Sequence, residues 1–520
     1  MISPLGVDPS ALRERRAFEY YFHYGALLIA GSLDVGFWKG IVLQLSRSEP
    51  AIWDAVIAIS ALYENPSCSP SAGLLLGSTS RNDDALVWYS RSIGSARKLI
   101  EQSKANEEIA IVTCVLYICI EIMQGHVHEA LQLYEQGLRL IHELKVSVGN
   151  YRMSFLDDTV IPLFLRMGTA ALSTAGVPVI KDLFALADYR GILGLFNAEA
   201  ARATLLPITR ESILFQWEAE AHLLEVGSAT NVSPEITARQ QELLSRLDNW
   251  YRSFTELMDY EDAKNSMHLI AISTLRVFHA AIFIMLSTCL TQWEMDSDTH
   301  LEYFKIIVEN ASRVVADGST PDGSQARFTF EAGVGEPLFA VTTKCRDPHL
   351  RREALSLLRR VPQVQAFFQS APRIARAEQY ILMEEAESIP GLTVRASDLS
   401  DITTESDTPL EGVKEISMDK LANLPAVEDL VTLEEEPSGD ERVSFVPEEK
   451  RIRKFVVVWL QSRVPESTTT SPARAFLHFT RNRPSPSYNH MWEEREYFLP
   501  INNFNGDESR LSNLLLGMRR

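Results

Sequence analysis

The sequence is poor in cysteine. Only five cysteines occur in 520 residues, and no two of them have C-x-x-C spacing. So small and odd a number is not that of a disulfide-stabilised scaffold. Cys114 and Cys119 lie five residues apart in an apolar stretch, with no histidine or cysteine close enough to complete a zinc site. We therefore expect buried, unpaired thiols and no metal site.

Familiar catalytic motifs are also missing. There is no glycine-rich dinucleotide or phosphate loop, no H-E-x-x-H and no G-x-S-x-G elbow. His126, His128 and His142 lie near one another, but His126 and His128 are two residues apart and so face different sides of a helix. We expect them at the surface or in a capping role. Glu384 and Glu385 come at a predicted helix end, where a solvated face is expected. The sequence thus predicts no enzyme, no catalytic residue and no cofactor.

Membrane and secretory signals are weak. The first 16 residues have no apolar core. The most apolar stretch, Met267–Leu290, is interrupted by His268, Arg276 and His279, which predicts a buried helix rather than a membrane span. With 50 Lys and Arg against 69 Asp and Glu, the net charge is −19, so the chain lacks the overall charge of a nucleic-acid binder.

What the sequence does contain is helical periodicity, from Ala11 to about Glu387. Apolar residues recur three and four positions apart, and no alternation of strands and helices is seen. A helix capped by Asn82 or Asp83 should follow the Ser/Gly/Pro-rich loop Ser67–Arg81. The other helices are predicted over Ala51–Tyr63, Glu107–Met123, Thr209–Val226, Pro234–Met258, Ser266–Leu290, His300–Ala316, Leu350–Ser370 and Pro372–Ala386. The expected fold is all-α, a multi-helix bundle of stacked antiparallel helices over residues 1–390.

Two helical segments resemble each other at an offset of 45 residues. Asp84–Ile100 and Glu129–Lys145 share an A-L-x-x-Y-x-x-x-I/L pattern. The apolar segment Glu107–Met123 between them should be the central helix of the bundle. The spacing is similar to that of tetratricopeptide-type hairpins. Coincidental similarity of amphipathic helices is the alternative, and both interpretations predict helices packed on helices.

The composition changes after Glu387. Between Arg395 and Lys450 there are 16 acidic and 5 basic residues, with few aromatics. Such a segment cannot bury enough apolar surface to offset its ordering entropy, so we predict a disordered acidic insertion over residues 391–442. Leu421–Leu433 alternates acidic and apolar residues, as activation or docking segments do. A solvated loop without a partner is an equal alternative.

The last part of the chain, residues 443–520, is expected to pack on the helical domain and to be partly ordered. Phe455–Leu460 is β-branched and aromatic, which favours a strand over a short buried helix. Ala473–Arg483 is basic with interleaved aromatics. We interpret it as an exposed strand or helix face, with contact to a polyanion as the alternative.

The opening of the chain carries the most specific pattern. Arg16-Ala17-Phe18 through Phe22 is followed by Phe37-Trp38 and then by EPAIWDAVIAISALYE, residues 49–64. This block resembles the start of the regulatory region of fungal zinc-binuclear-cluster (Zn2Cys6) transcription factors. The physical content agrees, because Phe37 and Trp38 supply large buried anchors and Pro50 can open a long helix.

Later elements continue this resemblance. Cys345-Arg346-Asp347-Pro348 through Leu358 is similar to the family's C-R-D-P-x-x-R-R-E-A-x-x-L-L element, and Val446 to Ile452 is similar to its closing segment. The resemblance covers about residues 11–390 and 443–465. It implies an all-helical body with a role in transcription in the nucleus.

One feature of the family is missing from these 520 residues. Its DNA-binding cluster needs six cysteines, two sets of C-x2-C-x6-C, to hold two zinc ions. Here the first cysteine is Cys68. We therefore expect a transcriptional regulator that makes no direct sequence-specific DNA contact. Other transcription factors or co-regulators are the expected partners, with a small-molecule effector in a helical pocket as a further candidate.

Two alternatives belong to other classes. One is a non-DNA-binding accessory protein or enzyme of fungal secondary metabolism on a helical scaffold. It would show perturbed titratable residues converging in a deep pocket. The other is a cytosolic helical scaffold with no transcriptional role.

Overall fold

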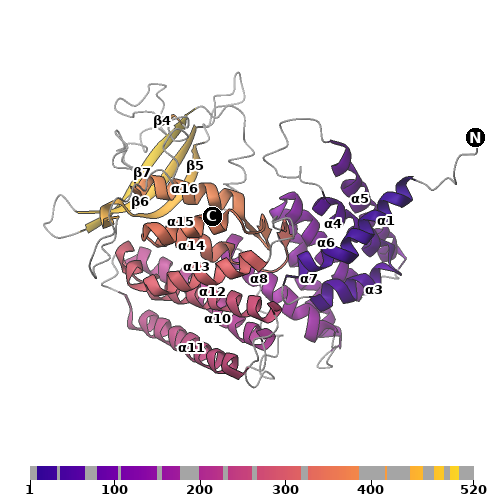
Figure 1. Cartoon of the computed structure of the whole chain (residues 1–520), viewed down its shortest axis with the longest axis horizontal. Helices are drawn as coiled ribbons and strands as arrows, with labels where there is room; N and C mark the ends of the chain where they lie inside the picture. Colours follow the sequence, from indigo (N-terminus) through magenta and orange to yellow (C-terminus); the bar gives the residue numbers. More distant parts are fainter. Residues whose placement is uncertain are drawn as a thin grey trace, which may run out of the picture.

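A computed structural model describes most of the helical region and the last strands. The described residues are 9–31, 35–64, 79–102, 107–148, 155–175, 198–226, 232–260, 266–317, 326–385, 416–417, 446–460, 474–484 and 492–502. Figure 1 shows two helical halves side by side, the N-terminal half in indigo and purple and the C-terminal half in magenta and orange. A small sheet, in yellow, lies beside α16. The predicted all-helical architecture is confirmed.

Within the described residues, the N-terminal half contains eight α-helices, joined in part by short π-helical turns. They are α1 (Pro9–Tyr20), η1 (Tyr21–Gly25), α2 (Ala26–Ala30), η2 (Gly36–Ile41), α3 (Val42–Ser46), α4 (Pro50–Glu64), α5 (Thr79–Glu101), α6 (Glu107–Gln124), α7 (Val127–Val148), η3 (Leu156–Val160) and α8 (Ile161–Ala175). As predicted, α6 is a central helix, and most of its residues from Ile111 to Ile122 are buried. Helix α4 is buried on nearly every side, and its sequence is mostly apolar; the buried Asp54 is paired with Arg91 of α5.

The predicted aromatic anchors are confirmed. Trp38 is fully buried and Phe37 nearly so, and their rings meet edge to face with centroids 5.0 Å apart. Helix α4 begins at Pro50, where the missing N–H costs no helical hydrogen bond. The indole of Trp38 also meets the ring of Phe330 at 5.1 Å, across almost 300 residues of sequence.

The start of α5 differs from the prediction. The helix begins at Thr79, so Asn82 and Asp83 lie inside its first turns rather than at its cap. The repeat pattern is met only in part: Ala85 and Ala130 are both buried, but Leu86 is 49% exposed. Tertiary packing is the reason, since α5 is covered mainly on the side facing α4, whereas α7 packs against α6 and also contacts α8.

The C-terminal half consists of longer helices. They are α10 (Ala198–Val226), α11 (Pro234–Tyr260), α12 (Ser266–Thr288), the 3₁₀ turn η6 (Glu294–His300), α13 (Leu301–Asp317), α14 (Gly335–Lys344), α15 (Pro348–Leu358) and α16 (Ser370–Glu385). The prediction of one helix over Leu350–Ser370 is wrong beyond Leu358. Pro362 supplies no N–H to a helix, and the chain instead forms the short strands β2 (Val364–Gln365) and β3 (Phe368–Gln369).

Helix α12 is long and apolar enough to cross a membrane by length and composition, over Leu269–Thr288. It packs against α10, α11, α13 and α14, and Ala280, Val277 and Leu286 are fully buried. The core helix of a soluble protein can have the same length and apolar composition. Its packing fits the prediction of a buried helix.

Two sheets complete the described structure. In the first, β1 (Phe328–Thr329) pairs in parallel with β2, which pairs with β3. The second is an antiparallel arrangement of β5 (Ile452–Leu460), β6 (Arg474–Pro484) and β7 (Trp492–Asn502). The strand predicted at Phe455–Leu460 is therefore confirmed. The predicted insertion, residues 391–442, lies outside the described residues except for β4 (Ile416–Ser417), which pairs with β7.

The segment around β1 connects the two halves by hydrogen bonds and by packing. The Phe330 amide donates to the Ile29 carbonyl at 3.0 Å, and the Tyr63 hydroxyl donates to the Phe328 carbonyl. Phe328 and Phe330 belong to the N-terminal core although β1 comes after α13 in the sequence. The division at residue 390 stays a prediction.

Candidate functional site: a cavity walled by a buried ion cluster

A cavity of about 1010 Å³ lies where the two halves meet. Its walls are helices α8, α10, α12, α13 and α14, together with residues 291–294, Ser297, residues 330–333, Gln365, Phe368 and single residues of β5 and β7. Helix α10 lines it with one face, from Arg202 through Ile213 and Trp217 to Leu223, because these positions recur every three or four residues. Its volume is at the upper end of the range for small-molecule sites.

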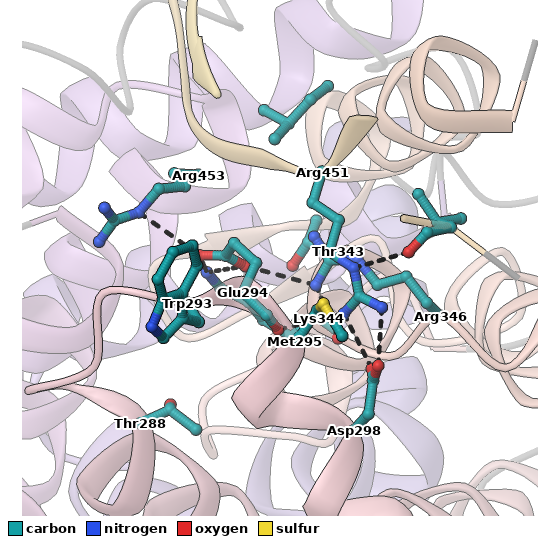
Figure 2. Close-up of polar contacts among 12 residues, drawn as sticks. Thr288, Trp293, Glu294, Met295, Asp298, Thr343, Lys344, Arg346, Arg451 and Arg453 are labelled. Carbon is teal, nitrogen blue, oxygen red and sulfur yellow. Dashed lines mark hydrogen bonds and ion pairs between the residues drawn. The ribbon is translucent and has the colours of Figure 1, made fainter. Parts of the chain in front are cut away.

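One end of the cavity is charged. Glu294, the first residue of η6, accepts hydrogen bonds from Nζ of Lys344 at 2.8 and 2.9 Å and from Arg346 at 3.3 Å. Nε of Arg453, on β5, lies 3.9 Å from the same carboxylate. Figure 2 shows these side chains converging from η6, the end of α14 and β5. Burial raises the pKa of Glu294, but Lys344 and Arg346 outweigh it and leave the pKa lowered.

Behind this wall the ion pairs continue into the protein core. Arg346 donates to Glu384 at 2.9 Å, and Arg351 lies 2.6 Å from the other Glu384 oxygen. All three side chains are fully buried. Burial alone would raise the pKa of Glu384, yet Arg346, Arg351 and the Ile452 amide lower it to about 2. The expectation of a solvated face at Glu384 is therefore wrong.

The closing segment, Val446 to Ile452, contacts the same cluster through hydrogen bonds and an ion pair. The Glu448 carboxylate accepts the amides of Glu294 at 3.0 Å and Met295 at 2.8 Å, so it caps the start of η6. Arg451, also fully buried, donates to both oxygens of Asp298 at 3.0 and 2.7 Å and to the Glu294 carbonyl at 3.2 Å. Figure 2 shows the Arg451 guanidinium directed toward Asp298. Burying a charge is unfavourable unless it is paired or hydrogen-bonded, and here Arg451 is paired with Asp298 and Glu448 accepts hydrogen bonds from two backbone amides.

The motifs that carry the family resemblance thus meet in space. Arg346 and Arg351 come from the C-R-D-P element, and Glu448 and Arg451 from the closing segment, about 100 residues later. Asp347 has a separate local role, because its side chain accepts the amides of His349 and Leu350 and caps α15. Neither motif by itself indicates that Glu294 and Glu384 are its partners, so these two residues could not be identified from the sequence.

The opposite end of the cavity is also polar. Arg202, on α10, pairs with Glu331 at 3.0 Å, and both are largely buried. Glu336 lies in the first turn of α14 and lines the cavity. Among the described residues, no group donates to its buried Oε2 atom. The walls between the two ends are largely apolar, with Ile213, Phe278 and Phe304 among the residues that line them.

The histidines singled out in the sequence lie elsewhere. His126 is half-exposed at the turn between α6 and α7, where it pairs with Glu121 at 2.8 Å. His128 contacts Gln132 on the surface of α7. Within the described residues, no group of three or more His, Cys, Asp or Glu side chains could hold a metal ion. Cys114, Cys119, Cys289 and Cys345 are free thiols, and burial raises the pKa of Cys345 to about 12; Cys68 lies outside the described residues.

Comparison with known proteins finds a family match within the N-terminal half. Residues 16–169 match the model of the fungal specific transcription factor domain. This match includes the aromatic opening and helices α4 to α7. This part of the N-terminal half is therefore similar to the fungal specific transcription factor domain.

Two curated relatives are transcription regulators by name. One is the transcription regulator lscL of Purpureocillium lilacinum, 23% identical over 277 residues, which are 48% of this chain and 64% of the relative. Another is the aspercryptin biosynthesis cluster-specific transcription regulator atnN of Emericella nidulans, 23% identical over 242 residues, 44% of this chain and 39% of the relative. The chain spans less than two thirds of either relative. No solved structure matches it.

Proposed function

We propose that this chain regulates transcription in the fungal nucleus by contacting other transcription factors or co-regulators, and that a small molecule bound in the cavity modulates it. The match of residues 16–169 to the fungal specific transcription factor domain carries this proposal. Since one relative is named as the regulator of a biosynthetic cluster, we extend the proposal to control of secondary metabolism.

The mode of action follows from the cysteines. These 520 residues contain no six-cysteine zinc cluster, so they lack the ligands that would organise its DNA-binding module. Sequence-specific DNA contact would then come from a partner protein or from residues outside this sequence. The helical body would supply the surfaces and the cavity through which the regulator is assembled and controlled.

The cavity is better suited to binding than to catalysis. Glu294 is held ionised by Lys344 and Arg346, so it is a poor proton donor near neutral pH. Glu384, whose pKa is lowered to about 2, does not line the cavity. The charged groups at the wall are therefore ion partners, and we include the absence of enzymatic activity in the proposal.

A reporter assay tests the transcriptional role. The chain, fused to a heterologous DNA-binding domain in a fungal host, should change reporter output several-fold relative to the DNA-binding domain alone. The W38A fusion is the matched control and should lose this effect, because Trp38 is an anchor of the N-terminal core. An intact nuclear fusion that leaves the reporter unchanged would overturn the proposal.

A second measurement tests the mode of action. The purified chain should show only weak, sequence-independent DNA binding that disappears with salt. Specific nanomolar binding to a DNA site by the chain alone would contradict action through protein partners.

A further inference from the structure

The polar groups of the cavity are arranged along one helix. Glu336, Pro337, Ala340 and Lys344 line the cavity from a single face of α14, because they are one, four and eight positions from the first residue. Glu336 lies near the beginning of this helix and Lys344 at its end. Eight residues correspond to about 12 Å along a helix axis. The cavity therefore presents two separate polar ends about one small-molecule length apart.

The Lys344 end has cationic hydrogen-bonding capacity left over. The ammonium of Lys344 carries three protons, and among the described residues two of them go to Glu294. Its side chain is 39% exposed and lines the cavity. Arg453 contributes a second cation and is held by one hydrogen bond to Glu494 at 3.4 Å. Two cations with spare donors favour an anionic group such as a carboxylate.

At the Glu336 end of the cavity, a hydrogen-bond acceptor lacks a donor among the described residues. The Oε2 atom of Glu336 is buried and, within the described part of the chain, accepts no hydrogen bond. A buried acceptor left unsatisfied is unfavourable, and a donor on a ligand would relieve this. The nearby Arg202 pairs with Glu331 at 3.0 Å. A hydroxyl or amine at this end of a ligand would be stabilised.

We propose that the cavity binds an elongated, mainly apolar carboxylic acid with a hydrogen-bond donor at its far end. The carboxylate is held by Lys344 and Arg453, the apolar body lies between α10, α12 and α14, and the donor contacts Glu336. This inference deepens the proposed function, on which it rests for the role of the ligand as an effector.

A carboxylate bound at this position would also be connected to the C-terminal sheet through ion pairs and hydrogen bonds. Arg453 belongs to β5 and its partner Glu494 to β7. Glu294 contacts Arg346, which contacts Glu384, which accepts the Ile452 amide at the start of β5. A carboxylate bound between Lys344 and Arg453 would therefore tighten the attachment of β5 to the helical body.

Three probes with the same twelve-carbon chain test this proposal on the purified wild-type chain by calorimetric titration. They are 12-hydroxydodecanoic acid, dodecanoic acid, which lacks the far donor, and 1,12-dodecanediol, which lacks the carboxylate. We expect the hydroxy acid to bind at least fivefold more tightly than dodecanoic acid and at least tenfold more tightly than the diol. Binding should also slow hydrogen exchange of the Ile452 amide.

Two variants test which residue contacts each end of the ligand. K344M should weaken the hydroxy acid about tenfold and leave the diol unchanged, whereas E336M should abolish the preference for the hydroxy acid over dodecanoic acid. The controls are K305M and E378M, which remove a lysine and a glutamate outside the cavity. Both controls should bind all three probes as the wild type does.

Failure of this inference is distinguishable from failure of the proposed function. The proposed ligand class is wrong if no probe binds the folded wild-type chain. It is also wrong if either dodecanoic acid or the diol binds as tightly as the hydroxy acid. The reporter result of the fused chain is independent of these probes. Regulation without probe binding would overturn only the ligand, and probe binding without regulation would overturn only the transcriptional role.

Discussion

The carboxylate of Glu384, near the end of α16, accepts the backbone amide of Ile452 at 2.8 Å while it pairs with Arg346 at 2.9 Å. One buried carboxylate thus connects the helical body to β5 of the C-terminal sheet, 68 residues further along the chain. Because Arg346 also contacts Glu294 in the cavity wall, the attachment of the sheet and the polar end of the cavity share one ion network.

The first prediction concerns this carboxylate. E384Q leaves Arg346 and Arg351 buried without their anion, and breaking a buried pair in this way costs about 3–5 kcal/mol. Urea denaturation followed by fluorescence should show a loss of that size. The control E378Q removes a carboxylate from the half-exposed pair with Arg359 and should cost at most about 1 kcal/mol. Equal stability of the two variants would contradict a structural role for Glu384.

The second prediction concerns acid. The pKa of Glu384 is about 2 in the folded chain against an ordinary 4.5. A lowered folded pKa means that its stabilisation is complete above pH 4.5 and is lost as the pH falls toward 2. The loss should amount to roughly 3 kcal/mol. Denaturation midpoints measured across this range should fall less steeply in E384Q than in the wild type; parallel curves would argue against it.

The third prediction concerns a buried histidine. His279, on α12, is 4% exposed and stacks on Tyr251 with ring centroids 4.0 Å apart. Burial lowers its pKa from 6.5 to about 4, so the neutral ring is the stable form. Stability should therefore fall as the pH drops from 6.5 toward 4. H279F keeps the ring stack and should flatten this part of the pH profile measured by thermal unfolding, whereas H126F, at a half-exposed site, should leave it intact.

The fourth prediction concerns the N-terminal core. W38A removes a fully buried indole that contacts Phe37 and Phe330, and should destabilise the chain by about 3–5 kcal/mol. F22A is the control, since Phe22 is 40% exposed, and should change stability by about 0.5 kcal/mol or less. Chemical denaturation monitored by circular dichroism gives both values. A W38A loss as small as that of F22A would mean that Trp38 is not an anchor.

Most of the helices and both aromatic anchors could be predicted from local patterns. Apolar residues three and four positions apart define the buried face of a helix wherever that face is covered, so α4, α6, α11, α12 and α13 could be predicted almost to their ends. Phe37 and Trp38 were predictable because side chains of their size are stabilised mainly by burial.

Which charges are buried and which apolar positions are exposed could not be predicted, because both depend on packing between elements that are distant in the sequence. Glu384 has the local pattern of a solvated helix end, and it is buried because Arg346, Arg351 and Ile452 reach it from elements that come before and after it in the chain. Leu86 has the pattern of a buried stripe, and it is exposed since no described element covers that side of α5. The reason is the same in both cases: burial is a property of the neighbours in space, and local periodicity holds no information about them.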